Sequence, residues 1–154
     1  MESRQSVTVL SFALNGIRER IKAWKNNGGE PDSLEWKIVN ASLATTDLGS
    51  VIGSVLPCIS IALIRVTGNI APHKHLLSNS AGVLLGEAEG FSFPPDPIET
   101  LLDDGWHSVH VGDLLVLTAG SPHGFRGVLS APLFALFLDS PPIDDATDHI
   151  LVEI

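Results

Sequence analysis

The 154-residue sequence has little of several residue types, and each shortage excludes a class of protein. Cys58 is its single cysteine, so no disulfide can form within the chain, and we expect the reducing cytoplasm as its compartment. Only 9 residues are basic against 18 acidic ones, which gives a formal charge of −9. A surface of this charge repels phosphate backbones, so we expect no nucleic-acid partner.

Long apolar runs and processing signals are also missing. No uninterrupted apolar run reaches the roughly 18 residues of a membrane span, so we expect no membrane partner. The first residues lack the cationic stretch that precedes the apolar core of a secretory signal. Neither a serine–histidine–aspartate arrangement nor a glycine-rich phosphate loop is present. These absences predict a soluble protein whose chemistry rests on other residues.

Apolar residues are abundant by contrast. They make up 44% of the chain, and the mean hydropathy of +0.27 is high for a soluble monomer. Charged residues make up only 18%. We therefore expect a second subunit to cover part of the apolar surface, most simply in a homodimer.

The N-terminal region shows the clearest helical pattern. Apolar residues recur there at three- and four-residue spacing and would share one face of a helix over 10–24: Leu10, Leu14, Ile17, Ile21 and Trp24. The run of Asn and Gly at 26–29, followed by Pro31, ends the pattern. The prediction is an N-terminal helix and linker over 1–29, and a β domain over 30–154, within a single domain overall.

Beyond Gly29 the chain reads as short strands. Apolar segments at 34–39, 57–67, 107–112, 113–120 and 133–142 are each bounded by turn residues. Residues 44–53 are rich in Gly, Ser and Thr and predict a loop, while the three prolines and the acids of 93–105 predict an exposed excursion. No alternation of strands and helices is present, so the pattern favours an all-β barrel or sandwich.

Two of the six histidines stand as His73-Lys74-His75. Side chains at i and i+2 of a strand share a face, so both imidazoles can point into one cavity. Neutral imidazole binds zinc, iron, nickel and copper, but two ligands need a third from elsewhere. The candidate is His123, which follows a predicted buried strand at 114–117 and a tight turn.

The two histidine segments resemble the paired motifs of the cupin superfamily. The first family motif is G-x5-H-x-H-x3,4-E-x6-G, and the second is G-x5-P-x-G-x2-H-x3-N. The first motif is matched by Gly68, His73, His75 and Gly86, with one residue fewer between Gly68 and His73 than in the family. The second motif is matched at the family spacing by Gly112, Gly120 and His123. The resemblance implies a cupin-like double-stranded β-helix (jelly-roll) barrel in which His73, His75 and His123 hold one divalent metal ion.

Three motif positions depart from the family. The glutamate falls on Asn79, the motif-two proline on Thr118 and the terminal asparagine on Gly127. Without the glutamate, three neutral imidazoles leave a charge of about +2 at the ion, which would attract an anionic or chelating substrate. Asn79 would either bind the metal through its amide oxygen or hydrogen-bond a metal-bound water.

The resemblance extends to three-histidine cupins such as thiol dioxygenases. It implies a small-molecule metalloenzyme, and the leading hypothesis is an Fe(II) dioxygenase, with zinc, manganese or nickel as other candidate ions. The first alternative is a non-redox isomerase, cyclase or lyase, in which the ion polarises a carbonyl and Glu87, Glu89 or an inward histidine acts as the base. The second alternative is a small-molecule-binding barrel without catalysis.

Other polar residues near the motifs have open roles. Glu87 and Glu89 share a face, either toward the cavity or along a solvent-facing strand edge. Arg65 or Arg126 would be able to hold a substrate carboxylate. His107 and His110 are expected at the surface or behind the ligands, and His149 is expected in solvent.

Overall fold

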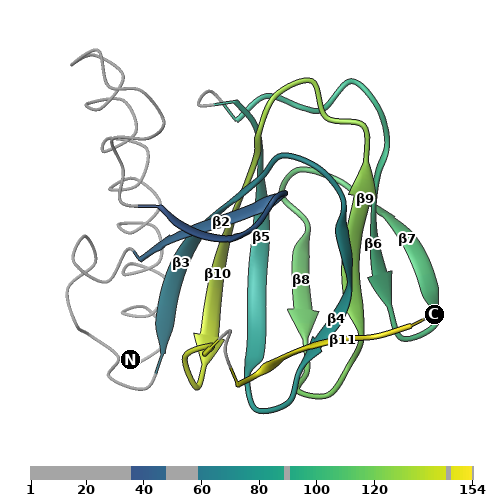
Figure 1. Cartoon of the computed structure of the whole chain (residues 1–154). Coiled ribbons are helices and arrows are strands. Elements are labelled where there is room, and N and C mark those ends of the chain that lie inside the picture. Colours follow the sequence, from purple (N-terminus) through teal and green to yellow (C-terminus); the bar gives the residue numbers. More distant parts are fainter. Residues whose placement is uncertain (1–35, 48–58, 89–90, 145–146, 154) are drawn as a thin grey trace, which may run out of the picture.

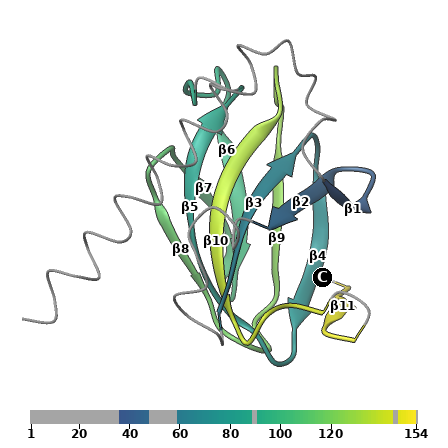
Figure 2. The ribbon, with the colours of Figure 1, turned by 90° about the vertical axis from the view of Figure 1, so that its left-hand side faces the viewer.

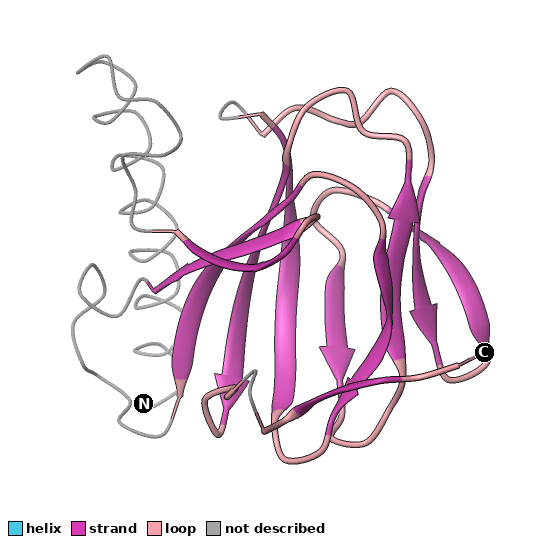
Figure 3. Cartoon of the chain, in the orientation of Figure 1, coloured by secondary structure: helices cyan, strands magenta, loops and turns pink. Residues whose placement is uncertain are grey.

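The computed structural model describes residues 36–47, 59–88, 91–144 and 147–153, and every regular element in these ranges is a β-strand (Figure 3). The helix predicted at 10–24, and with it the boundary at residue 29, lies outside the described residues. No helix in the described ranges has the length and hydropathy of a membrane span. The all-β prediction is confirmed for the described part of the chain.

The strands form two antiparallel sheets (Figure 1). The six-stranded sheet has the order β1-β2-β3-β10-β5-β8, and the five-stranded sheet has the order β11-β4-β9-β6-β7. The bounds are β1 Lys37–Asn40, β2 Leu43–Asp47, β3 Ser60–Val66, β4 Ile70–His75, β5 Asn79–Glu87, β6 Ile98–Leu102, β7 Gly105–Val109, β8 Leu114–Leu117, β9 His123–Gly127, β10 Leu133–Ser140 and β11 His149–Leu151.

Strand β10 is central to the six-stranded sheet, between β3 and β5, and Figure 2 shows these three strands side by side. Every second residue of β10, from Leu133 to Asp139, lines the space between the sheets, as the two-residue period of a strand dictates. The main core lies in that space and draws on both sheets: Val66, Leu84, Leu133 and Ala135 from one, Ile98, Val109 and Phe125 from the other.

The other face of the six-stranded sheet is also apolar. Leu63, Phe134 and Leu136 are buried there, and partly buried side chains such as Trp36 and Phe91 pack against them. Because both faces of β10 are buried, the strand reads as an almost continuous apolar run instead of an alternating one.

Three strand predictions need correction. Residues 44–47 lie in the segment predicted as a loop, yet they belong to β2, which pairs with β3. The predicted excursion at 93–105 contains β6, whose Ile98 and Leu101 are buried because it lies between β9 and β7. The predicted buried strand at 114–117 is β8, an edge strand with Leu114 and Val116 exposed.

Candidate metal centre

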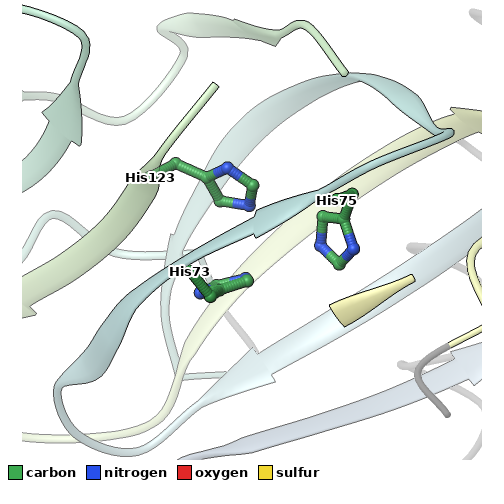
Figure 4. A group of neighbouring side chains, drawn as sticks. All are labelled: His73, His75 and His123. Carbon is green, nitrogen blue, oxygen red and sulfur yellow. The ribbon is translucent and has the colours of Figure 1, made fainter. Parts of the chain in front are cut away.

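His73, His75 and His123 lie together between the sheets, as the motif spacing predicts. Figure 4 shows their imidazoles pointing toward one another, two from β4 and one from β9. Each offers one nitrogen within 4.8 Å of those offered by the other two, and all three residues are buried. The ring centroids are 4.3 Å apart for His73 and His123, and 5.2 Å apart for the other two pairs.

Strand pairing places the three side chains. His73 lies directly opposite His123 in the β4–β9 ladder, and His75 follows on the same face of β4. The turn before β9 is tied to β4 because the Gly120 N–H donates to the His75 carbonyl at 2.7 Å. Gly120 has a φ of +85°, and Gly112 at the turn before β8 has a φ of +92°, so both turns require the left-handed backbone that glycine adopts without strain.

Backbone carbonyls fix the tautomer of two of these imidazoles. His73 Nδ1 lies 2.9 Å from the Ala71 carbonyl oxygen, and His123 Nδ1 lies 3.1 Å from the Ser121 carbonyl oxygen. A carbonyl only accepts hydrogen bonds, so Nδ1 carries the hydrogen in both rings. The Nε2 lone pairs of His73 and His123 are then available to a metal ion.

Burial keeps these imidazoles neutral. Desolvation, reinforced by repulsion from His123 and other neighbouring imidazoles, lowers the pKa of His73 from 6.5 to about 3. Desolvation is also the main cause that lowers the pKa of His123 to about 4. Neutral imidazole is the form that coordinates a metal, so the donor set fits a divalent transition ion. That an ion binds here stays a prediction.

His149 belongs to the same cluster, and the prediction that it is solvated is wrong. Strand β11 pairs with β4 and sets His149 opposite His75. The His149 ring stacks on that of His73 with centroids 4.3 Å apart and an interplanar angle of 16°. No local sequence pattern predicts that His149 lies in this cluster, because the short strand β11 is placed by pairing with β4, more than seventy residues earlier in the chain.

Asn79 and Glu87, the two candidates for catalytic roles, lie outside the cavity lining. Asn79 Oδ1 accepts a hydrogen bond of 3.0 Å from the Ala119 N–H, so it fastens the turn after β8. Glu87 is 2% exposed, and its carboxylate accepts hydrogen bonds from the Ser130 N–H and hydroxyl, both at 2.8 Å. It is therefore neither at the cavity nor along a solvent-facing edge. Glu89 lies outside the described residues.

The remaining candidates lie at the surface or away from the cavity. His107 and His110 are exposed beside Asp104 and Asp113, respectively, which agrees with a surface role. Arg126 Nε donates to Glu99 at 2.7 Å, and its guanidinium lies over Trp106. The Arg65 guanidinium lies over Trp36. Neither arginine lines the cavity, so neither is placed to hold a substrate there.

The three histidines open onto a cavity of about 300 Å³ between the sheets. Its walls are largely apolar, and its polar lining includes the three ligand candidates, His149, Lys37, Asp47, Ser60, Ser80, Thr100 and Asp139. The sequence analysis missed Asp139. Counting in steps of two from the apolar Leu133, which turns into the core, would have placed Asp139 on the inward row of β10.

Asp139 is a buried carboxylate held by two serines. It is 4% exposed and lies directly opposite Ser60 on β3 and Ser80 on β5. Ser80 Oγ donates to Asp139 Oδ1 at 2.5 Å, and Ser60 Oγ lies 3.4 Å from Oδ2. The cavity thus has histidines on one sheet and an oriented carboxylate on the other.

Comparison with known proteins gives likeness in structure but not in sequence. No family model matches the chain, and no curated protein matches it. Among solved structures, the polyketide cyclase RemF from Streptomyces resistomycificus aligns with a TM-score of 0.58 and 15% identity over 81% of this chain and 84% of that chain. KdgF from Halomonas sp. aligns with a TM-score of 0.56 and 18% identity over 76% of this chain and 96% of that chain.

A third neighbour carries the superfamily name. A sugar phosphate isomerase of the cupin superfamily from Silicibacter pomeroyi aligns with a TM-score of 0.53 and 20% identity, over 73% of this chain and 74% of that chain. The chain has the cupin fold. The resemblance drawn from the motifs is thereby confirmed at the level of fold, and the two sheets and the histidine cluster stand where the cupin motifs predict them.

Proposed function

We propose that this cupin is a metal-dependent small-molecule enzyme with non-redox chemistry: an isomerase, cyclase or lyase. The observation that supports it is that three buried histidines and the buried Asp139 line one cavity. Removal of a proton next to a carbonyl requires a base and is assisted by a Lewis acid, and this cavity offers a place for each. Two of the neighbours described above are a polyketide cyclase and a sugar phosphate isomerase, so we favour this alternative over Fe(II) oxygen chemistry.

His73, His75 and His123 would hold the ion, and a bound divalent ion supplies polarisation of a substrate carbonyl, which acidifies the neighbouring C–H bond. Asp139 would accept that proton on a carboxylate oxygen and return it at the next carbon or to a leaving oxygen. The hydroxyls of Ser60 and Ser80 hold the carboxylate in one orientation toward the cavity. The largely apolar walls would limit the access of water to the substrate while the proton is held.

The cavity favours an uncharged, chelating substrate over an anionic one. Among the lining residues, Lys37 is the one Lys or Arg, whereas Asp47 and Asp139 are acidic. Asp148 adds a buried carboxylate beside His75. An ion of charge +2 next to the two buried carboxylates, Asp139 and Asp148, leaves a net charge of about zero, so a negative substrate gains little. We propose a largely apolar molecule with a carbonyl oxygen next to an exchangeable proton.

Metal content and deuterium exchange test this function. We expect near-stoichiometric zinc or another divalent ion in the reconstituted wild type, and none in a His73→Asn/His123→Asn double variant. Incubation in D2O with a panel of uncharged dicarbonyl and hydroxyketone compounds should give metal-dependent loss of a C–H signal in the NMR spectrum of at least one compound, without oxygen uptake.

The Asp139→Asn variant separates the base from the metal site. We expect it to retain the metal and to lose about 10²–10⁴-fold in exchange rate, the usual contribution of a positioned base. Asp113→Asn, at an exposed carboxylate that accepts the His110 N–H, is the matched control and should behave as wild type. Oxygen uptake on substrate addition would favour the dioxygenase, and wild-type protein that takes up no metal would refute an enzyme of this type.

A further inference from the structure

The geometry points to Asp148 as a positioning residue for the third histidine of the centre: its carboxylate fixes the tautomer of His75 and so presents His75 Nε2 to the metal. The role of Asp148 in metal binding rests on the proposed function, since it presupposes the metal site. The contact between Asp148 and His75 is present in the metal-free protein and is tested there.

Asp148 is buried immediately before β11, with 2% of its surface exposed. One carboxylate oxygen, Oδ1, accepts a hydrogen bond of 2.7 Å from the Leu77 N–H in the turn between β4 and β5. The other, Oδ2, lies 3.9 Å from His75 Nδ1 and accepts no hydrogen bond from the described residues. A buried carboxylate oxygen without a donor is unfavourable, so its direction toward an imidazole calls for an explanation.

The other two histidines provide that explanation. In His73 and His123, Nδ1 faces a backbone carbonyl, which holds the hydrogen on Nδ1 and leaves Nε2 for the ion. His75 has the Asp148 carboxylate near its Nδ1 instead. At 3.9 Å this is an ion-pair distance and longer than a hydrogen bond, but the carboxylate offers only acceptors and so favours the Nδ1–H tautomer. All three rings then have the same tautomer.

The position of Asp148 also affects the negative charge close to the metal site. The motif position of the family's glutamate ligand is Asn79 in this chain, and Asn79 Oδ1 is bonded to the Ala119 N–H. Asp148 brings one negative charge next to a ligand instead of into the ligand set. A carboxylate behind a metal-bound histidine raises the basicity of that ligand and typically changes metal affinity by about 10–100-fold.

The substitution Asp148→Asn tests the inference with almost no change of shape. Asn Oδ1 can keep the bond from the Leu77 N–H, while an NH₂ group replaces Oδ2 near His75 Nδ1. A donor there favours the Nε2–H tautomer, in which Nε2 has no lone pair for the metal. In ¹⁵N NMR of the metal-free proteins we expect His75 to be Nδ1–H in wild type and to shift toward Nε2–H in the variant. Zinc affinity, measured by competition with a chelating dye, should fall about 10–100-fold.

Asp139→Asn is the matched control, because it removes the same charge at another buried carboxylate, one that lines the cavity. It should leave the His75 tautomer unchanged and weaken zinc binding less than Asp148→Asn does. Equal losses in both variants, with the tautomer of His75 constant, would show that only charge matters and would overturn the positioning role. Should Asp148→Asn fail to fold, the wild-type spectrum decides alone, and an Nε2–H tautomer of His75 there refutes the inference.

The two proposals fail in different ways. Wild-type protein that binds no zinc but has His75 as Nδ1–H would contradict the proposed function and leave the contact with Asp148 standing. Wild-type and Asp148→Asn proteins that bind zinc equally well would contradict this inference and leave the metal site standing.

Discussion

At the scale of single residues, the buried histidines make the stability of the metal-free protein depend on pH. The pKa of His73 is lowered from 6.5 to about 3, and that of His123 to about 4, chiefly because burial disfavours the charged ring. Between these values and 6.5 the unfolded chain binds more protons than the folded one, so the free energy of unfolding falls as the pH falls. Above 6.5 both states carry neutral rings, and this effect vanishes.

We expect each of these two histidines to contribute a slope of at most about 1.4 kcal/mol per pH unit in that window. Urea denaturation of the metal-free protein from pH 7.5 to 5 measures it. His73→Asn removes one of the two groups, so its free energy of unfolding should fall less steeply than that of wild type. Parallel curves for the two proteins would contradict the assignment.

Glu87 gives a second prediction at this scale. Its buried carboxylate binds the Ser130 N–H and hydroxyl and lies 3.4 Å from the Ala131 N, so it anchors the segment that leads into β10. Glu87→Gln keeps an acceptor oxygen for the Ser130 N–H and makes the Ser130 hydroxyl an acceptor, so the hydrogen bonds to a charged carboxylate are lost. We expect a loss of about 1–3 kcal/mol in the free energy of unfolding, with metal content unchanged. A Glu87→Gln variant that loses the metal but keeps wild-type stability would show instead that Glu87 acts at the metal site.

Some residues of the site could be predicted from short sequence motifs, and others could not. His73, His75 and His123 were predictable because two short motifs with fixed spacing carry them. Asp139, Asp148 and His149 were not, because strand pairing over long separations places them near the three histidines: β10 pairs with β3 and β5, and β11 pairs with β4. Such pairing leaves no spacing rule in the sequence.

At the scale of elements, the same contrast separates the strands. The apolar run that became β3 and the motif segments that became β4 and β9 were predictable from composition and turn residues. Strands β2 and β6 were not predictable, because the sequence around β2 is rich in Thr and that around β6 is rich in acids. Strand β2 forms by pairing with β3, and β6 forms by pairing with β7 and β9. Strand propensity is set largely by such neighbours.

The pairing of β5 with β10 has one close contact that can be tested. Gly82 lies opposite Phe137, and a Cβ at Gly82 would fall 2.4 Å from atoms of the phenyl ring. Gly82→Ala should therefore cost about 1–3 kcal/mol in the free energy of unfolding, the usual penalty of overpacking. Combining it with Phe137→Leu, which removes the ring, should cost less than the two single changes added together. Additive losses in urea denaturation would refute the contact.

At the scale of the whole molecule, a homodimer in the cytoplasm remains a prediction from composition. The structure adds exposed apolar side chains on more than one strand, among them Leu114 and Val116 on the edge strand β8. We expect light scattering to give a mass twice the 16.4 kDa of the chain at micromolar concentration. A mass of one chain over the whole concentration range would contradict the prediction.

The fold as a whole should survive loss of the metal. Leu63, Leu133 and Leu136 are almost completely buried in an apolar core, so we expect this core to form without an ion, unlike that of small zinc domains. An ion that binds only the folded state at 100 times its Kd adds about 2.7 kcal/mol, which corresponds to a rise in Tm of roughly 5–10 °C for a chain of this size.

Zinc titration followed by thermal unfolding measures this effect, with a chelator to reverse it. The double variant His73→Asn/His123→Asn should unfold cooperatively at a Tm that zinc does not change. A chelator that unfolds the wild type outright would show that the ion holds the barrel together. The three histidines would then contribute to the fold itself, and the preformed cavity on which proton transfer depends would exist only in the metal-loaded protein.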